Sequence, residues 1–213
     1  ELKENQMINN NTLEIEGTVV SDFVYSHEVF GEGFYTFFVE IERTSGKKDR
    51  IPVMISERMV DVKTNMVGTG IHINGQFRSF NKRVGEKNRL ILSVFARKIQ
   101  ILEDDPVPKN TISFRGTICK DPKYRETPLG REITDLLLAV NRPYGKSDYI
   151  PCICWGRNAR FAGNMSVGDK IEVFGRIQSR EYTKKLSDTE SEIRIAYEIS
   201  VSRLEVIYSG EEN

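Results

Sequence analysis

An internal repeat restricts the fold of this chain more than any other feature of its sequence. Residues 11–19 (NTLEIEGTV) match residues 110–118 (NTISFRGTI), and the same offset of 99 pairs Gly46-Lys47 with Gly145-Lys146. Farther along, the offset rises to 100 and then to 105, so the insertions fall in two places, as loops tolerate. A repeat of about a hundred residues is the size of a small domain, and the sequence therefore predicts two copies of one domain.

The boundary between the copies is marked by composition. Residues 103–108 contain two prolines and three acidic residues, which is typical of a short, stiff and solvated linker. We therefore expect a first domain at 1–103, a linker at 104–108 and a second domain at 109–213.

Each copy has the pattern of an all-β domain. In the second copy, alternating or β-branched segments predict strands at 111–120, 132–141, 149–155, 170–179 and 192–207. A helical segment is expected at 157–165, with its counterpart at 57–66. Five strands with a helix between the third and fourth is the order of the OB-fold, a small five-stranded barrel. A β-sandwich is the alternative, but Gly116 and Gly175 inside strands favour a sharply bent barrel.

Composition excludes several classes of protein. The 31 Lys and Arg balance 31 Asp and Glu, so the chain is not a uniformly basic nucleic-acid coat, and it has no apolar run of membrane-spanning length. Cys152 and Cys154 are separated by one residue, which is not zinc-ligand spacing, so the three cysteines are expected to be core thiols in a reducing compartment. We expect no metal, no cofactor and no enzymatic activity.

The second copy resembles a known family. The sequences Asn-Thr-Ile-Ser-Phe-Arg-Gly-Thr-Ile from 110, Leu-Ala-Val-Asn-Arg from 138, Trp-Gly-Arg-Asn-Ala from 155 and Gly-Asp-Lys-Ile-Glu-Val-Phe-Gly-Arg from 168 occur in the order found in the bacterial single-stranded DNA-binding protein family. The first copy resembles this family mainly through the second. The resemblance implies two tandem OB-folds in one chain.

The resemblance also implies sequence-independent binding and protection of single-stranded DNA in replication, recombination or repair. The family's aromatic positions fall on Tyr144, Tyr149, Trp155 and Tyr182. Tyr149 and Trp155 are six residues apart on one expected strand and so point to the same face. Such rings stack on bases of any kind, although an aromatic residue on a strand is also often part of a core.

Basic residues in the second copy are candidate phosphate contacts. Residues 115–185 contain 14 Lys and Arg against 8 Asp and Glu. Neutralising phosphates releases counterions, which makes binding salt-dependent. The expected DNA-contacting cations are Arg115, Arg125, Arg142, Lys146, Arg157, Arg180 and Lys184.

The first copy departs from the family pattern. The four aromatic positions are occupied by Ser45, Arg50, Ser56 and Lys82, and residues 1–105 contain 14 Lys and Arg against 16 Asp and Glu. Arg50, Phe80 and Lys82 are its candidate DNA contacts, but we expect the second copy to provide most of the affinity. Alternation places Phe34 and Phe38 on the outer face, toward DNA or, as Glu40 on that face slightly favours, toward a protein partner.

The resemblance extends to assembly and location. The family commonly brings four OB-folds into one binding unit, which two chains of this kind provide, so a homodimer is implied. It further implies a cytoplasmic, nucleoid-associated protein with possible replication or primosome partners, no membrane association and no small-molecule substrate. One alternative is a primosome-type OB protein that acts mainly through protein partners. A less favoured one is an OB-fold nuclease, which requires a carboxylate cluster that the sequence does not display.

Overall fold

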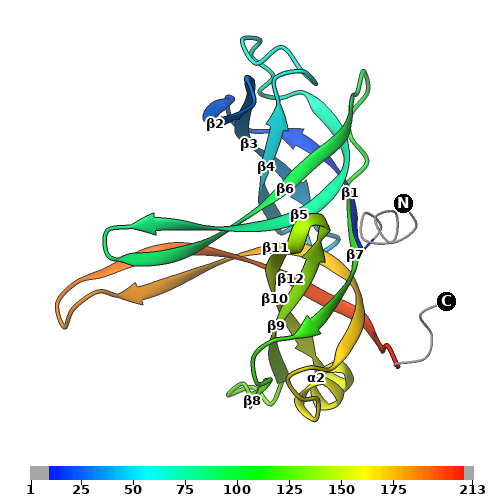
Figure 1. Cartoon of the computed structure of the whole chain (residues 1–213), viewed down its shortest axis with the longest axis vertical. Helices are drawn as coiled ribbons and strands as arrows, with labels where there is room; N and C mark the ends of the chain where they lie inside the picture. The colour runs from blue at the N-terminus through cyan, green and yellow to red at the C-terminus, as the bar shows by residue number, and fades with distance from the viewer. Residues whose placement is uncertain (1–9, 209–213) are drawn as a thin grey trace.

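The computed structural model describes residues 10–208, and over this range the chain is mostly β (Figure 1). Strands account for all of the large elements between residues 10 and 208, where the helices are one α-helix and one short 3-10 turn. The first repeat contains β1 (Asn11–Val19), β2 (Val24–Val29), β3 (Glu32–Glu42), β4 (Lys48–Ser56), β5 (Gly70–Val84) and β6 (Lys87–Ile101). The second contains β7 (Lys109–Ile118), β8 (Lys123–Glu126), β9 (Glu132–Arg142), η1 (Pro143–Gly145), β10 (Lys146–Trp155), α2 (Gly156–Gly163), β11 (Lys170–Lys185) and β12 (Ser191–Val206).

The strand order is symmetric about the middle of the sheet. It runs β2-β3-β4-β6-β5-β1 and then β7-β11-β12-β10-β9-β8, so each strand of one repeat has its counterpart in the other. Two additional pairings, β3 with β1 and β7 with β9, close each half into a ring of five hydrogen-bonded strands. One further strand lies outside each ring: β2 pairs with β3 in the first repeat, and β8 pairs with β9 in the second.

Alternation along the strands fills the interior of each ring. On β1, Leu13, Ile15, Gly17 and Val19 are buried while the residues that alternate with them are more exposed. Gly75 and Gly175 lie at equivalent register shifts, in β5 and β11. A Cβ atom at either glycine would collide with the backbone carbonyl oxygen of the facing strand, so these bends require glycine.

The prediction of a helix at 57–66 is wrong. In the second repeat α2 occupies the expected place between β10 and β11, whereas residues 57–66 form a series of turns. Asp61 accepts hydrogen bonds from the backbone of Lys63 and the hydroxyl of Thr64, and Asn65 accepts one from the backbone of Val67. These local side-chain bonds compete with helical ones. The short strand β8 was also not predicted from the sequence.

The two repeats are joined by antiparallel pairing of their first strands. Residues 11–16 of β1 pair with residues 109–114 of β7, with Leu13 opposite Ile112. Because β1 and β7 each belong to a closed ring, this seam converts two rings into one continuous sheet. Residues 102–108, between β6 and β7, form no strand.

Two buried carboxylates reach across from one repeat to the other. Asp49 of β4 accepts hydrogen bonds from the backbone nitrogen and hydroxyl of Ser179 on β11, at 2.9 and 3.1 Å. At the equivalent place, Asp148 of β10 accepts one from the backbone nitrogen of Ser79 on β5, at 2.8 Å. Both aspartates are fully buried. Two equivalent contacts therefore join the rings, one made by a carboxylate of each repeat.

The two aspartates differ in how well they are paired. The Arg43 side chain donates two hydrogen bonds of 2.6 Å to Asp49. Burial raises the pKa of Asp49, but the bonds from Arg43 and Ser179 outweigh it, and the net pKa is lowered. Arg142 Nε lies 3.0 Å from Asp148 Oδ2 without the alignment of a hydrogen bond. Burial therefore dominates there, and the pKa of Asp148 is raised.

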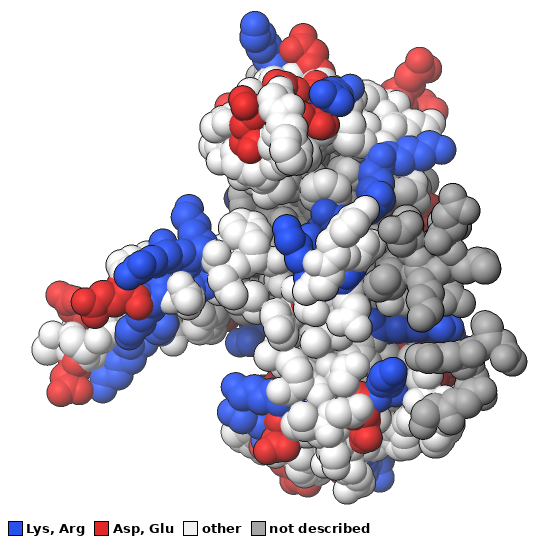
Figure 2. Space-filling model, viewed as in Figure 1, with Lys and Arg blue, Asp and Glu red and all other residues white. Residues whose placement is uncertain are grey.

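Long hairpins project from the rings. The β5–β6 and β11–β12 arms extend to the same side of the molecule in Figure 1. Their outer parts, residues 81–89 and 181–190, are exposed throughout. Figure 2 shows Lys and Arg side chains along these arms, with acidic side chains toward the ends.

The cysteine expectation is only partly correct. Cys152 and Cys154 are buried on the inner face of β10, and burial raises the pKa of Cys154 to about 12. Cys119, which follows β7, is exposed. Within residues 10–208, three or more His, Cys, Asp or Glu side chains nowhere gather as a metal-binding group. No helix in the same range has the length and apolar character needed to cross a membrane.

The aspartate pair generates a prediction about stability. Asp49→Asn removes two charge-assisted hydrogen bonds and should lower the free energy of unfolding at pH 7 by about 2–3 kcal/mol. Asp148→Asn keeps an acceptor for Ser79 and removes a less well paired carboxylate, although Arg142 and Arg78 lose its charge, so its loss of stability should be the smaller of the two. Urea denaturation at pH 7 measures both.

The pH dependence provides the control. Because folding lowers the pKa of Asp49, its contribution is present at neutral pH and is lost as the pH falls through the folded-state pKa. The difference between Asp49→Asn and the wild type should therefore shrink in acid. Equal losses for the two variants at pH 7 would contradict the assignment.

Candidate nucleic-acid interface

Strand β10 presents two of the expected aromatic residues to solvent. Tyr149 and Trp155 are 41% and 38% exposed, while Ile150, Cys152 and Cys154 between them are buried. The two rings thus share the outer face of one strand, as their spacing predicts, and neither is fully in the core. Each has an open side that a base can cover.

Tyr144 lies on the turn η1 that leads into β10. Its φ of 66° is in the left-handed region, which is uncommon for a residue other than glycine. Its side chain is 92% exposed and hydrogen bonds to nothing among the described residues. The backbone therefore holds this ring out in solvent, next to the outer face of β10.

Tyr182 lies on the β11–β12 arm. It is 37% exposed, and the Arg180 guanidinium lies 5.9 Å from its ring centroid. Arg180 also pairs with Glu198 of β12 at 3.1 Å. The arm thus combines an aromatic ring with a cation, the pair of groups that single-strand-binding grooves use.

The expected cations of the second repeat fall into two groups. Within residues 10–208, no carboxylate lies within ion-pair distance of Lys146, Arg157 or Lys184, and all three are exposed. The others have partners: Arg115 with Glu172, Arg125 with Asp135, Arg180 with Glu198 and Arg142 with Asp148. The first three pairs are well exposed on the arginine side and are weak, whereas Arg142 is less exposed and lies 3.0 Å from a fully buried carboxylate.

The expected residues of the first repeat are all on the surface. Arg50 is exposed, with its guanidinium 5.4 Å from the Phe38 ring centroid. Phe80 is 43% exposed and Lys82 is exposed, both on the β5–β6 arm. Alternation along β5 puts Arg78 on the same face as Phe80 and Lys82.

Sequence reasoning missed part of the first repeat's surface. Phe34, placed on the outer face, stacks between His27 and Phe95, and Arg78 lies over Phe95. Neither Phe95 nor Arg78 was expected in the site. A signal was available for Phe95, because Leu92, Val94 and Ala96 alternate inward and leave Phe95 outside.

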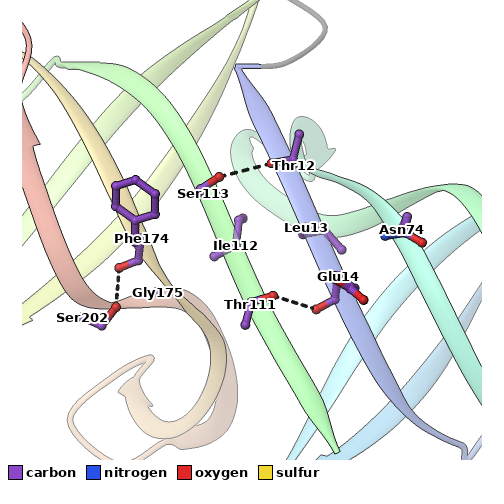
Figure 3. Close-up of a pocket in the computed structure, with 10 residues that line it drawn as sticks. All are labelled: Thr12, Leu13, Glu14, Asn74, Thr111, Ile112, Ser113, Phe174, Gly175 and Ser202. Atoms are coloured by element: carbon purple, nitrogen blue, oxygen red, sulfur yellow. Dashed lines mark hydrogen bonds between the residues drawn. The ribbon is translucent and has the colours of Figure 1, made fainter.

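A shallow hollow of about 430 Å³ lies over the β1–β7 seam (Figure 3). Thr12 and Ser113 face each other across it at 3.2 Å, and the Thr111 hydroxyl lies 3.5 Å from the backbone oxygen of Glu14. Its lining includes no Lys or Arg and none of the expected site residues. The seam hollow is therefore a separate feature from the aromatic surface of β10.

The closed five-stranded rings define an all-β protein of the OB-fold class, with aromatic and basic side chains exposed on its surface. Residues 109–206 match the family described as "Single-strand binding protein family". The resemblance of the second repeat to the bacterial single-stranded DNA-binding proteins is thereby confirmed.

Individual relatives give the same result. The "Single-stranded DNA-binding protein" of Clostridium tetani is 39% identical over 83 residues, which are 36% of this chain and 57% of that protein. The protein of the same description from Halalkalibacterium halodurans is 35% identical over 80 residues, 34% of this chain and 48% of that protein. The chain thus spans about half the length of these curated relatives.

Solved structures match over both repeats. The crystal structure of the wild-type single-stranded DNA binding protein from Thermus aquaticus has a TM-score of 0.73 at 21% identity and covers 95% of each chain. A deletion mutant of that protein gives a TM-score of 0.70 at 22% identity, over 95% of this chain and 98% of that one. At such identity the likeness concerns the fold alone.

The β10 surface generates a prediction that separates stacking from charge. Trp155→Ala should weaken binding of labelled oligo-dT by about 1–3 kcal/mol and leave the slope of log K against log salt unchanged. Lys146→Ala should instead reduce that slope by about 0.7. Fluorescence anisotropy at several salt concentrations measures both quantities. Arg142 is a poorer choice for this test, because its removal also disturbs Asp148.

The thermal stability of the free variant serves as the control. Trp155 is partly exposed, so Trp155→Ala should melt close to the wild type. A large drop in Tm, with affinity retained by the folded fraction, would instead assign Trp155 to the packing of the barrel.

Proposed function

We propose that this protein binds single-stranded DNA without sequence preference and protects it in replication, recombination or repair. The observation that carries the proposal is the outer face of β10, where Tyr149 and Trp155 are exposed on the repeat that matches the single-strand binding family. Base stacking gives affinity without reading sequence, since every base has a π-face.

We infer that each ring is an OB-fold barrel and that the chain carries two in tandem, a first domain at 1–103, a linker at 104–108 and a second domain at 109–213. Ring closure and the symmetric strand order support this division, as does the fold shared with the Thermus aquaticus protein. Residues 1–9 and 209–213 of these ranges lie outside the described residues.

In the proposed binding mode, aromatic rings and cations divide the work. Tyr144, Tyr149, Trp155 and Tyr182 stack on successive bases, and Lys146, Arg157 and Lys184 meet phosphates without first giving up a carboxylate partner. Arg115, Arg125 and Arg180 exchange weak surface pairs for phosphates. We leave Arg142 out of the direct contacts, because the buried Asp148 holds it. The first repeat adds Arg50, Phe80 and Lys82.

The proposal describes a binding protein and assigns it no catalytic step, cofactor or small-molecule substrate. A cytoplasmic, nucleoid-associated location follows from this role, as do partners among replication or primosome proteins.

The direct test is titration with oligo-dT and with a duplex of the same length while following the fluorescence of Trp155, the only tryptophan of the chain. Quenching by oligo-dT at low salt, with little response to duplex, is the expected result. Equal responses to both would overturn the proposal.

We further propose a homodimer with two-fold symmetry, which brings four barrels into one binding unit. Light scattering at micromolar concentration should give a mass near twice the 24.4 kDa of the chain. A mass equal to one chain would refute the dimer and would leave the DNA-binding proposal standing.

A further inference from the structure

Four side chains form a stacked strip on the outside of the first repeat. The rings of His27 on β2 and Phe34 on β3 are 5.1 Å apart and nearly parallel, at 11°. Phe34 is in turn stacked against Phe95 of β6, at 6.0 Å and 29°. The Arg78 guanidinium, from β5, lies 4.0 Å from the Phe95 ring centroid. The strip thus takes residues from three strands of the ring and from the outer strand β2, and its members are partly or fully exposed.

The strip lies where the second repeat carries its tryptophan. Phe34 pairs with Ser56 of β4, just as Ile133 pairs with Trp155 of β10. On the other side, Phe95 has the register position in β6 that Ser200 has in β12. The first repeat therefore has Phe34 opposite a small residue, with Phe95 opposite Met54 one strand further on, and the second has Trp155 opposite a buried isoleucine, with Ser200 opposite Ile153. The aromatic surface lost at Ser56 is restored from the two neighbouring strands.

Positive charge gathers at one end of the strip. Arg78 is half-buried, and burial, together with the nearby charges of Arg142 and Arg97, lowers its pKa to about 10. Among the described residues, the only carboxylate that acts on Arg78 is Asp148, which lies across the repeat boundary. Arg78 and Arg97 both donate hydrogen bonds to the side-chain oxygen of Gln76, at 2.8 and 3.4 Å, so two guanidinium groups meet at one neutral acceptor. Such a concentration of positive charge is typical of sites that receive an anion such as phosphate.

Two carboxylates near the other end are already engaged. Glu57 accepts a hydrogen bond of 2.9 Å from the backbone nitrogen of Gly33, and Glu32 accepts one from Ser56 and lies 3.7 Å from Arg58. These contacts tie down the ends of β3 and β4 below the strip. They leave the exposed sides of His27 and Phe34 open.

We propose that His27, Phe34 and Phe95, together with Arg78, form a second base-stacking platform for single-stranded DNA, located in the first repeat. The proposal rests on the proposed function and names the part that the first repeat plays in it. A row of stacked rings that ends at a guanidinium group offers faces for bases and a cation for the backbone.

The platform is continuous with the surface of the second repeat. Arg78, Phe80 and Lys82 share one face of β5, and Ser79 between them accepts a hydrogen bond of 2.7 Å from the backbone nitrogen of Tyr149. One strand of DNA can therefore pass from Phe34 and Phe95 over Arg78 and Phe80 to Tyr149 and Trp155.

The first experiment compares substitutions that remove π-faces but keep apolar volume. In the full chain, the double variant Phe34→Leu/Phe95→Leu should bind a long oligo-dT about tenfold more weakly than the wild type. A short oligo-dT, of the smallest length that saturates Trp155 quenching, should bind the double variant and the wild type with equal affinity. Phe174→Leu is the matched control, because Arg203 lies over Phe174 at the same 4.0 Å, and it should leave both affinities unchanged.

The pattern of outcomes separates this proposal from the proposed function. Undiminished binding of long oligo-dT by the folded double variant overturns the platform, while Trp155 quenching still supports DNA binding by the second repeat. Absence of quenching in the wild type refutes the proposed function itself. If light scattering gives the double variant a different mass from the wild type while DNA binding is unchanged, the strip is a protein contact and the platform is overturned.

A second measurement needs no variant. Ultraviolet irradiation of the wild-type protein with oligo-dT links thymine to aromatic residues that it stacks on, and mass spectrometry of the digest locates the adducts. Adducts on the peptides that contain Phe34 or Phe95 are expected. If adducts form at Trp155 or Tyr149 and at neither phenylalanine, the platform is rejected even if the double variant fails to fold.

Discussion

The antiparallel pairing of β1 with β7 is the contact on which the rest of the molecule depends. Each of these strands closes a ring of its own, so their pairing fixes two rings in one orientation. Only in that orientation does Asp49 reach Ser179 and does Asp148 reach Ser79. The same arrangement brings β5 of the first repeat beside β10 of the second, where the Tyr149 backbone nitrogen donates a hydrogen bond to Ser79.

Much of this arrangement was predictable from the sequence, because local pattern decides it. Alternation placed most of the strands, and the repeat offset placed Ser56 at the position of Trp155. The sequence was misleading at 57–66, where Asp61 and Asn65 bond to nearby backbone groups and turns replace a helix. Contacts between distant residues were beyond reach. Asp49 and Ser179 are 130 residues apart, and the stacking of Phe95 on Phe34 depends on strands that are not adjacent in the chain.

The repeats have the same backbone plan but different chemistry at equivalent places. Asp49 has strong hydrogen bonds and a lowered pKa, whereas Asp148 is less well paired and has a raised one. Ser56 lies opposite Phe34, and Trp155 lies opposite Ile133. In both cases the neighbouring residues have changed along with the central one. The divergence of the first repeat is therefore a rearrangement of its surface and not simply a loss of aromatic residues.

Covalent linkage of the repeats has a genetic and a directional consequence. In a dimer of identical single-domain chains, one codon alters both binding faces at once. In this chain a codon alters one face only, so the two faces are free to become unlike, as Ser56 and Trp155 have. DNA has a 5′ and a 3′ end. A strand that crosses two unlike faces meets them in an order set by its polarity, so the two ways of laying it down differ in energy.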